Sequence, residues 1–309
     1  MLKSKWRLRR CKSEGKTVDL TSRLLQSISS CFPVRLFTAI SRDFKATCRS
    51  TSLSECPSNS STFSDKIFTK RFQPLSFPTT FLFSMISWVS GGKTNFNLID
   101  QLQKSGVFNA NVVRQVMQSV DRADFTASNP YQDSPQAIGF GATISAPHMH
   151  AMALEGLVDV IKPNSRILDV GCGSGYLTTC FAKMVGENGT VIGIDHIDEL
   201  VQMSERNIRK HNADLLDTKK IKLIVGDGRK GFADEAPYDA IHVGAAAPEM
   251  PQDLIDQLAV GGQMLIPVGR ANQEFLAVEK QSDGSIRKRT LAHVIYVPLT
   301  DSAKQFQRN

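Results

Sequence analysis

The sequence predicts an α/β fold in which a mostly parallel, doubly wound sheet of seven strands has one antiparallel edge. Short, continuous apolar runs alternate with amphipathic stretches over the second half of the chain, a pattern typical of parallel strands covered by helices on both faces. The last apolar runs follow one another without long helical stretches between them, which favours antiparallel pairing. The 309 residues suffice for one such domain and an extension.

The folded domain is expected over residues 88–309, and apolar spacing predicts its elements. Two short helices joined around Gly106 are predicted by Leu98, Leu102, Val112, Val113, Val116, Met117 and Val120. Strands are then expected over 166–170, 190–195, 221–225, 238–243, 263–268, 275–280 and 293–299. Helices are expected over 148–161, 176–185, 197–211 and 251–258.

Positive charge is concentrated near the N-terminus. Residues 1–87 hold 15 Lys/Arg and 5 Asp/Glu, whereas the other 222 residues hold 22 Lys/Arg and 25 Asp/Glu. The basic character therefore describes the first segment and not the folded domain. We accordingly expect no nucleic-acid partner.

Residues 1–87 also contain 17 serines and no sustained apolar period, which predicts a disordered, basic extension. Three alternatives remain for this segment: a disordered tail, a start codon assigned too far upstream with the native start at Met85, and an organelle transit peptide. The uncharged stretch 73–92 is a marginal membrane candidate because two prolines interrupt it, so we expect no stable membrane association. Cysteines without CxxC pairs suit a reducing compartment. We expect a cytoplasmic protein, with organelle targeting by residues 1–84 left open.

A glycine-rich loop, 171–175 (GCGSG), connects the first predicted strand to a helix. Glycines such as Gly171 and Gly173 let the backbone approach a ligand, and the helix start offers free N–H groups. The dinucleotide fingerprint is spaced GxGxxG, whereas this loop is GxGxG with Asp169 before it. A nicotinamide site needs donors for a pyrophosphate, while an acid at this place suits the cationic methionyl part of S-adenosylmethionine. A purely structural glycine turn is the alternative.

Two more acids follow the next two strands. Asp195 ends the second strand, 26 positions after Asp169, where a carboxylate can accept both ribose hydroxyls. Asp227 and Gly228 follow the third strand, placed to border an adenine ring. Parallel strands bring these ends to one edge of the sheet. The pattern predicts a Rossmann-like class I methyltransferase, with a non-binding relative of the same fold as the alternative.

The segment before the glycine loop resembles a known family. Residues 129–151 (NPYQDSPQAIGFGATISAPHMHA) strongly resemble the signature of protein-L-isoaspartate (D-aspartate) O-methyltransferases. The resemblance continues through 226–229, 236–248, 254–258 and 296–300 and covers residues 85–306. It implies methyl transfer from S-adenosylmethionine to the free α-carboxylate of L-isoaspartyl and D-aspartyl residues in damaged proteins, which are the expected partners. The ester would then initiate repair through a succinimide.

The resemblance also implies site residues. Ser145 stands in the position regarded as catalytic, and His150 is expected to lie against the cofactor. Cys172 replaces a serine common in relatives, and its small side chain should leave binding intact. The loop after Gly269 is slightly shortened. The residues expected to contact S-adenosylmethionine are Ala142, Thr143, Ile144, Ser145, His150, Asp169, Gly171, Gly173, Asp195, His196, Asp227, Gly228, Thr300 and Gln305.

Simpler interpretations exist for some of these residues. By local sequence alone Ser145 is interpreted as a helix cap or a satisfied loop hydroxyl, and the resemblance favours the catalytic role. His148 and His150 form an HxH pair, but no third ligand is evident. We therefore expect no metal site. His242, in an apolar strand, is expected to be structural.

Two other functions remain as alternatives. Ubiquitin-ligase adaptors built on this domain carry long C-terminal extensions, whereas this chain stops at Asn309. A class I methyltransferase of small molecules or RNA would show a basic or aromatic patch over 95–165, and none is visible. Both observations favour the enzyme, which we expect to be a monomer.

Overall fold

The computed structural model describes residues 91–301 and 305. The expectations for residues 1–87, for Met85 as a start and for nearly all of the stretch 73–92 lie outside the described residues. Within the part that is described, no helix is long and apolar enough to cross a membrane.

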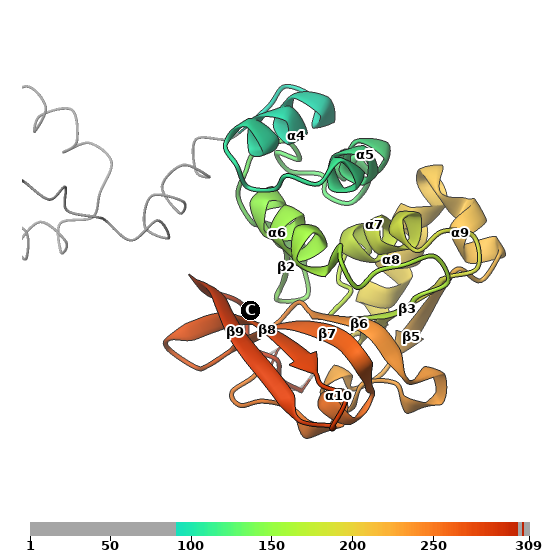
Figure 1. Ribbon diagram of the computed structural model, residues 1–309. Coiled ribbons are helices and arrows are strands. Elements are labelled where there is room, and N and C mark those ends of the chain that lie inside the picture. The colour runs from blue at the N-terminus through green and yellow to red at the C-terminus, as the bar shows by residue number, and fades with distance from the viewer. Residues whose placement is uncertain (1–90, 302–304, 306–309) are drawn as a thin grey trace, which may run out of the picture. The chain divides into compact units, whose positions relative to one another are not determined.

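The centre of the fold is a seven-stranded sheet in the order β5-β4-β3-β6-β7-β8-β9 (Figure 1). Its parallel strands are β3 (Arg166–Val170), β4 (Thr190–Asp195), β5 (Ile221–Val225), β6 (Tyr238–Val243) and β7 (Leu258–Val268). The antiparallel edge consists of β8 (Gln273–Lys280) and β9 (Ile286–Val294). The predicted fold class is confirmed. The strand order reverses between β3 and β6, where open α/β sheets bind ligands.

Alternate side chains of β3 build the two layers of the core. Ile167 packs with Leu154 and Phe181 on one face, and Leu168 packs with Leu254 on the other, as the two-residue period of a strand requires. The first face is covered by α4 (Asn95–Lys104), α5 (Asn111–Ser119), α6 (Pro147–Leu157), α7 (Tyr176–Met184), α8 (Asp198–His211) and α9 (Ala213–Asp217). The second face has the short helix α10 (Gln252–Asp256) and loops (Figure 1).

The last strand differs from our expectation. We predicted residues 293–299, whereas β9 spans Ile286–Val294 and is paired along β8. Its charged sequence is accommodated because β9 is the outermost strand, where Arg287, Lys288 and Arg289 reach solvent. Residues 295–299 leave the sheet edge and cross to the end of β6, where Ala246 N–H donates to the Val297 carbonyl and Leu299 N–H donates to the Ala246 carbonyl.

A small hairpin precedes α6 and was not predicted. It pairs β1 (Gln136–Gly139) with β2 (Ala142–Ile144). Phe140 and Gly141 both have positive φ, 54° and 65°, as the central residues of a type I′ turn require. A bulky residue such as Phe140 rarely takes this conformation, and such strain is found preferentially at functional sites.

Candidate active site

A pocket opens at the carboxyl ends of β3, β4 and β6, which is where open α/β sheets bind ligands. We call its two sides the inner wall and the outer wall. The inner wall is formed by the strand ends and the loops that leave them: Val170, Gly171, Gly173, Ile194, Asp195, His196, Leu200, Gly228, Gly244 and Ala245. The outer wall comes from β2 and the C-terminal segment: Ala142, Thr143, Val297, Pro298, Leu299, Thr300 and Gln305.

The glycine loop of the inner wall has a backbone that only glycine adopts easily. Gly171, Gly173 and Gly175 have φ values of 77°, 52° and 85°, in the left-handed region. The N–H of Gly171 donates to the carbonyl of Ile194 at 2.8 Å, which fixes the loop to the end of β4. Gly244 lies so close that a Cβ there would stand 3.1 Å from the Gly171 carbonyl oxygen. The floor of the pocket is therefore bare backbone.

Asp195 is buried in the same wall. Its Oδ2 accepts from the N–H of Gly173 at 3.1 Å and its Oδ1 from the N–H of Ile197 at 3.2 Å. Burial raises the pKa of this carboxyl above its usual range, and the two amide bonds oppose that rise. A carboxylate oxygen has capacity for further donors, so Asp195 can accept ligand hydroxyls while it holds the loop.

Gln305 connects the outer wall to two distant parts of the chain. Its Oε1 lies 2.7 Å from His196 Nε2, and its Nε2 donates to the Phe140 carbonyl at 2.9 Å. The strained hairpin turn, the residue after β4 and the C-terminal segment are thus joined over the pocket. The family resemblance implied that Gln305 contacts S-adenosylmethionine.

The four residues 142–145 lie in different surroundings. Ala142 and Thr143 line the pocket, whereas Ile144 is buried in the core. Ser145 is half-buried and lies outside the pocket lining. Its side chain is hydrogen-bonded to Tyr296, a phenol whose pKa burial raises above the usual range. The Ser145 hydroxyl is therefore held from the C-terminal segment.

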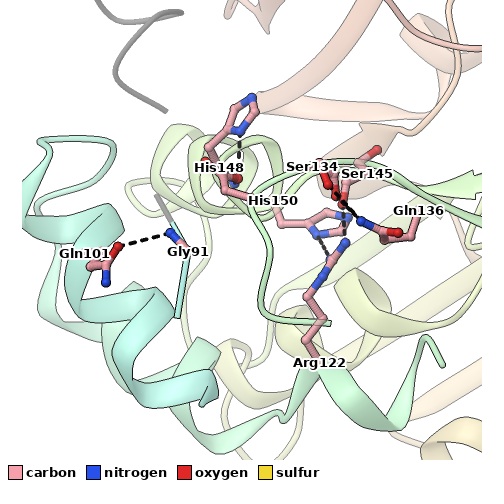
Figure 2. Close-up of polar contacts among 9 residues, drawn as sticks. Gly91, Gln101, Arg122, Ser134, Gln136, Ser145, His148 and His150 are labelled. Carbon is pink, nitrogen blue, oxygen red and sulfur yellow. Dashed lines mark hydrogen bonds and ion pairs between the residues drawn. The ribbon is translucent and has the colours of Figure 1, made fainter. Parts of the chain in front are cut away.

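Ser145 is also held from below by Arg122, in the short 3₁₀ helix η1 (Arg122–Asp124). Arg122 Nη2 donates to the Ser145 carbonyl at 2.8 Å, and Nη1 lies 3.2 Å from His150 Nδ1 (Figure 2). Burial, followed by the Arg122 charge, lowers the pKa of His150 well below its usual value. His150 is therefore neutral, and its Nδ1 accepts the hydrogen bond from Arg122.

The same close-up shows how the rest of this segment is fixed. Gln136 Nε2 donates to Ser134 Oγ at 2.8 Å, ahead of the hairpin (Figure 2). His148 is not part of the pocket lining, and its Nδ1 lies 2.8 Å from Asp133 Oδ1. Among the described residues no three metal-binding side chains form a group.

Comparison with known proteins decides the family. The family described as protein-L-isoaspartate (D-aspartate) O-methyltransferase matches residues 93–304. The chain belongs to this family.

Individual relatives agree. A Caenorhabditis elegans protein-L-isoaspartate O-methyltransferase is 51% identical over 226 residues, which cover 72% of this chain and 100% of the relative. Protein-L-isoaspartate O-methyltransferase 2 of Arabidopsis thaliana is 51% identical over 219 residues, covering 70% of this chain and 71% of the relative. A Plasmodium falciparum structure, described as a β-aspartate methyltransferase in complex with S-adenosyl-L-homocysteine, is 37% identical with a TM-score of 0.64. It covers 68% of this chain and 99% of that one.

The pocket of this methyltransferase fits S-adenosylmethionine. Among the described residues, its lining contains one carboxylate, that of Asp195, and a floor of bare backbone. Asp195 can hold ribose hydroxyls, and the bare floor admits the flat parts of the molecule. The side-chain set therefore matches the family's methyl donor.

Five of the expected cofactor residues do not line the pocket: Ile144 and Ser145, described above, and Asp169, Asp227 and His150. Asp169 is buried below the loop, where Oδ2 accepts from Thr178 Oγ1 at 2.5 Å and Oδ1 lies 2.8 Å from His242 Nδ1. The Asp227 carboxylate is engaged by both Nε and Nη2 of Arg229 at 2.8 Å, so only its neighbour Gly228 lines the pocket. His150 lies behind the lining, with its ring centroid 4.9 Å from that of Tyr176.

Some lining residues were missed from the sequence. Gly244 and Ala245 follow β6, and a glycine at the end of a parallel strand was a usable signal. Residues 297–299 were assigned to a strand, and that error hid their place in the outer wall. Arg122 carries no local signal, because a single arginine near Asp121 and Asp124 resembles an ordinary surface residue.

Proposed function

We propose that this chain methylates the free α-carboxylate of L-isoaspartyl and D-aspartyl residues, with S-adenosylmethionine along the inner wall and Ser145 beside the reacting carboxylate. As a member of its family, the chain is an S-adenosylmethionine-dependent protein-L-isoaspartate O-methyltransferase. One observation carries the proposed residue roles. The segment that holds Ser145 lies next to the pocket of the glycine loop, so one site can serve donor and acceptor.

The reaction asks the protein for placement more than for proton transfer. A peptide carboxyl group has an ordinary pKa of about 4 and is ionised at neutral pH, so no general base is needed. Bound S-adenosylmethionine supplies an electrophilic methyl group on a positively charged sulfur. Asp195 and the glycine loop would fix the donor, and the chain's task is then to hold the carboxylate oxygen in line with that methyl group.

Ser145 suits this task because its hydroxyl offers a single, neutral hydrogen bond. A strong ionic partner would stabilise the carboxylate before reaction and oppose the loss of its charge. Tyr296 sets the orientation of the Ser145 side chain from one direction, and Arg122 fixes its main chain from another. The hydroxyl can therefore orient the acceptor without large rearrangement.

Selection of isoaspartyl over aspartyl linkage is assigned to residues 134–145. An isoaspartyl residue offers an α-carboxylate one methylene closer to the backbone than an aspartyl side chain does. The β1–β2 hairpin, pinned by Gln305 at Phe140, would set the depth to which a carboxylate enters. The methyl ester then cyclises spontaneously to a succinimide, which reopens partly to normal aspartate.

Labelled methyl transfer tests the proposal. The full chain is incubated with methyl-labelled S-adenosylmethionine and two peptides that differ only in isoaspartyl versus aspartyl linkage. We expect base-labile label on the isoaspartyl peptide alone. Equal label on both peptides, or no label, would refute the proposed function. RNA and small carboxylic acids are tested as acceptors in the same assay. Label on either would favour the alternative function, a class I methyltransferase of RNA or small molecules.

Nothing in the comparisons supports the adaptor hypothesis. For the folded domain, residues 88–309, we further propose a monomer with no nucleic-acid partner, in a reducing compartment such as the cytoplasm. Cys172 and Cys180 are buried free thiols, which supports the last point. Light scattering of the purified chain would test the monomer, because a dimer mass would contradict it.

A further inference from the structure

Arg122 is a buried cation whose contacts are neutral. It is 1% exposed, its two terminal nitrogens meet the Ser145 carbonyl and the His150 ring, and its guanidinium carbon lies 5.6 Å from the Tyr176 ring centroid. Its Nε has no hydrogen-bond partner. A buried arginine is normally paired with a carboxylate, because desolvation of an unpaired charge is costly.

Among the described residues, no carboxylate is paired directly with this guanidinium. Asp133 acts on it from a greater distance; its Oδ1 is engaged by the N–H and Nδ1 of His148, while its buried Oδ2 has no hydrogen-bond partner, so its compensation of the Arg122 charge is partial. Burial lowers the pKa of Arg122 to about 10, so the guanidinium remains charged at neutral pH.

The position of Arg122 connects both halves of the active site. One hydrogen bond reaches the main chain of Ser145, on the acceptor side. The stacked ring belongs to Tyr176, the first residue of α7 after the glycine loop, on the donor side. His150 in α6 lies between them. The Arg122 guanidinium, which has no directly paired carboxylate in the described part of the chain, therefore lies behind the Ser145 peptide group. The substrate carboxylate is proposed to bind beside the Ser145 side chain.

We propose that Arg122 is a positioning residue that fixes Ser145 and whose charge, which has no directly paired carboxylate, draws the isoaspartyl carboxylate into the site. The inference rests on the proposed function. It assigns to Arg122 a preference for a negatively charged acceptor over a neutral one of the same shape. Placement behind a peptide group supplies attraction without a direct ionic hydrogen bond.

The same placement would help the product to leave. The substrate enters with one negative charge and the methyl ester is neutral, so the attraction ends once the methyl group has been transferred. Arg122 would therefore strengthen substrate binding without retaining the product. Loss of the Arg122 charge should mainly weaken the affinity for substrate. Loss of its hydrogen bond to the Ser145 carbonyl should mainly lower turnover.

The test compares two peptides that differ only in the α-group of the β-linked residue, carboxylate or carboxamide. Each is titrated by calorimetry into the full chain saturated with S-adenosyl-L-homocysteine, so that no turnover occurs. We expect wild type to prefer the carboxylate, and Arg122→Met to reduce that preference by about tenfold. Arg122→Lys keeps the charge but cannot hold Ser145 and His150 together, so it should retain the preference while turnover falls.

Arg114→Met is the matched control, because Arg114 is a half-buried arginine paired with Asp100 in α4 and should leave the preference unchanged. Equal loss of affinity for both peptides in Arg122→Met would show a purely structural role and overturn the inference. If that variant does not fold, Arg122→Lys decides, since loss of the preference there contradicts a charge effect. A wild type that methylates isoaspartyl peptides yet shows no preference overturns this inference alone, whereas failure to methylate overturns the proposed function.

Discussion

The inner and outer walls of the pocket are held in different ways. The inner wall stands on β3, β4 and β6, strands paired on both sides and buried on both faces. The outer wall consists of β2, from the two-stranded hairpin, and the C-terminal segment, and single side-chain contacts such as those of Gln305 and Tyr296 hold it in place. Donor binding should therefore depend on rigid backbone, and acceptor placement on a few replaceable hydrogen bonds.

The largest effect is expected in the inner wall, from Asp195→Asn. We expect the Kd for S-adenosylmethionine to rise on the order of 10- to 100-fold, because hydrogen bonds to a charged group are lost. Burial raises the folded-state pKa of Asp195 above its unfolded value, so its charge opposes folding once the pH exceeds those values. Asn can accept from only one of the Gly173 and Ile197 N–H groups, so this lost hydrogen bond offsets the relief of the buried charge and the Tm of the ligand-free variant at pH 7 to 8 should change little.

Calorimetry would measure the Kd for S-adenosylmethionine, and thermal unfolding would measure the Tm. Asp198→Asn, at an exposed acid in the first turn of α8, is the control and should alter neither. A fall in Tm together with unchanged affinity would mean that Asp195 stabilises the fold and does not bind the donor.

The next effect separates the walls by function. Ser145→Ala should lower kcat on the order of tenfold through misplacement of the acceptor, with the Kd for S-adenosylmethionine changed less than about twofold. Ser119→Ala, which removes a hydroxyl bonded locally within α5, should change neither value. A large loss of donor binding in Ser145→Ala would make Ser145 a cofactor ligand instead.

Gln305→Leu should have a smaller effect that falls on donor release. Both hydrogen bonds over the pocket are lost, and we expect the dissociation rate of S-adenosyl-L-homocysteine to increase about fivefold. Stopped-flow fluorescence would measure it. Gln252→Leu, at a glutamine bonded to Asp256 on α10, provides the comparison. An unchanged rate would mean that the outer wall does not close on the donor through Gln305.

The smallest effect is expected from Tyr296→Phe. Loss of the phenol leaves Ser145 with one orienting contact fewer, and KM for the isoaspartyl peptide should rise about twofold. Burial raises the pKa of Tyr296 above its usual range, so the phenol stays uncharged and the variant should keep the wild-type pH profile from pH 6 to 9. An alkaline decline present only in wild type would contradict this.

The walls also differ in how well the sequence predicted them. The strands of the inner wall are continuous apolar runs, and Gly171, Gly173, Gly228 and Asp195 were located correctly at the sheet edge. Asp169 shows the limit of such reasoning. It is the last residue but one of β3, so strand alternation turns its side chain under α7 toward Thr178, and a strand end alone does not specify that direction.

Most of the outer wall could not be predicted from local pattern. The hairpin strands have four and three residues, too few for a recognisable period, and the turn uses Phe140 where Asn or Gly would signal it. β9 was misplaced because Arg287, Lys288 and Arg289 break the apolar run that marks a buried strand. Arg122 depends on contacts with residues 23 and 28 positions away, which no local window contains.

The charged edge strand has a consequence for an enzyme whose substrates are damaged proteins. Partly unfolded chains expose strands that can add to any open sheet edge. In β9 that edge carries Arg287, Lys288 and Arg289, all exposed, and burying such cations against another strand is unfavourable. The cations of β9 therefore disfavour the addition of a strand from a partly unfolded substrate to this edge of the sheet.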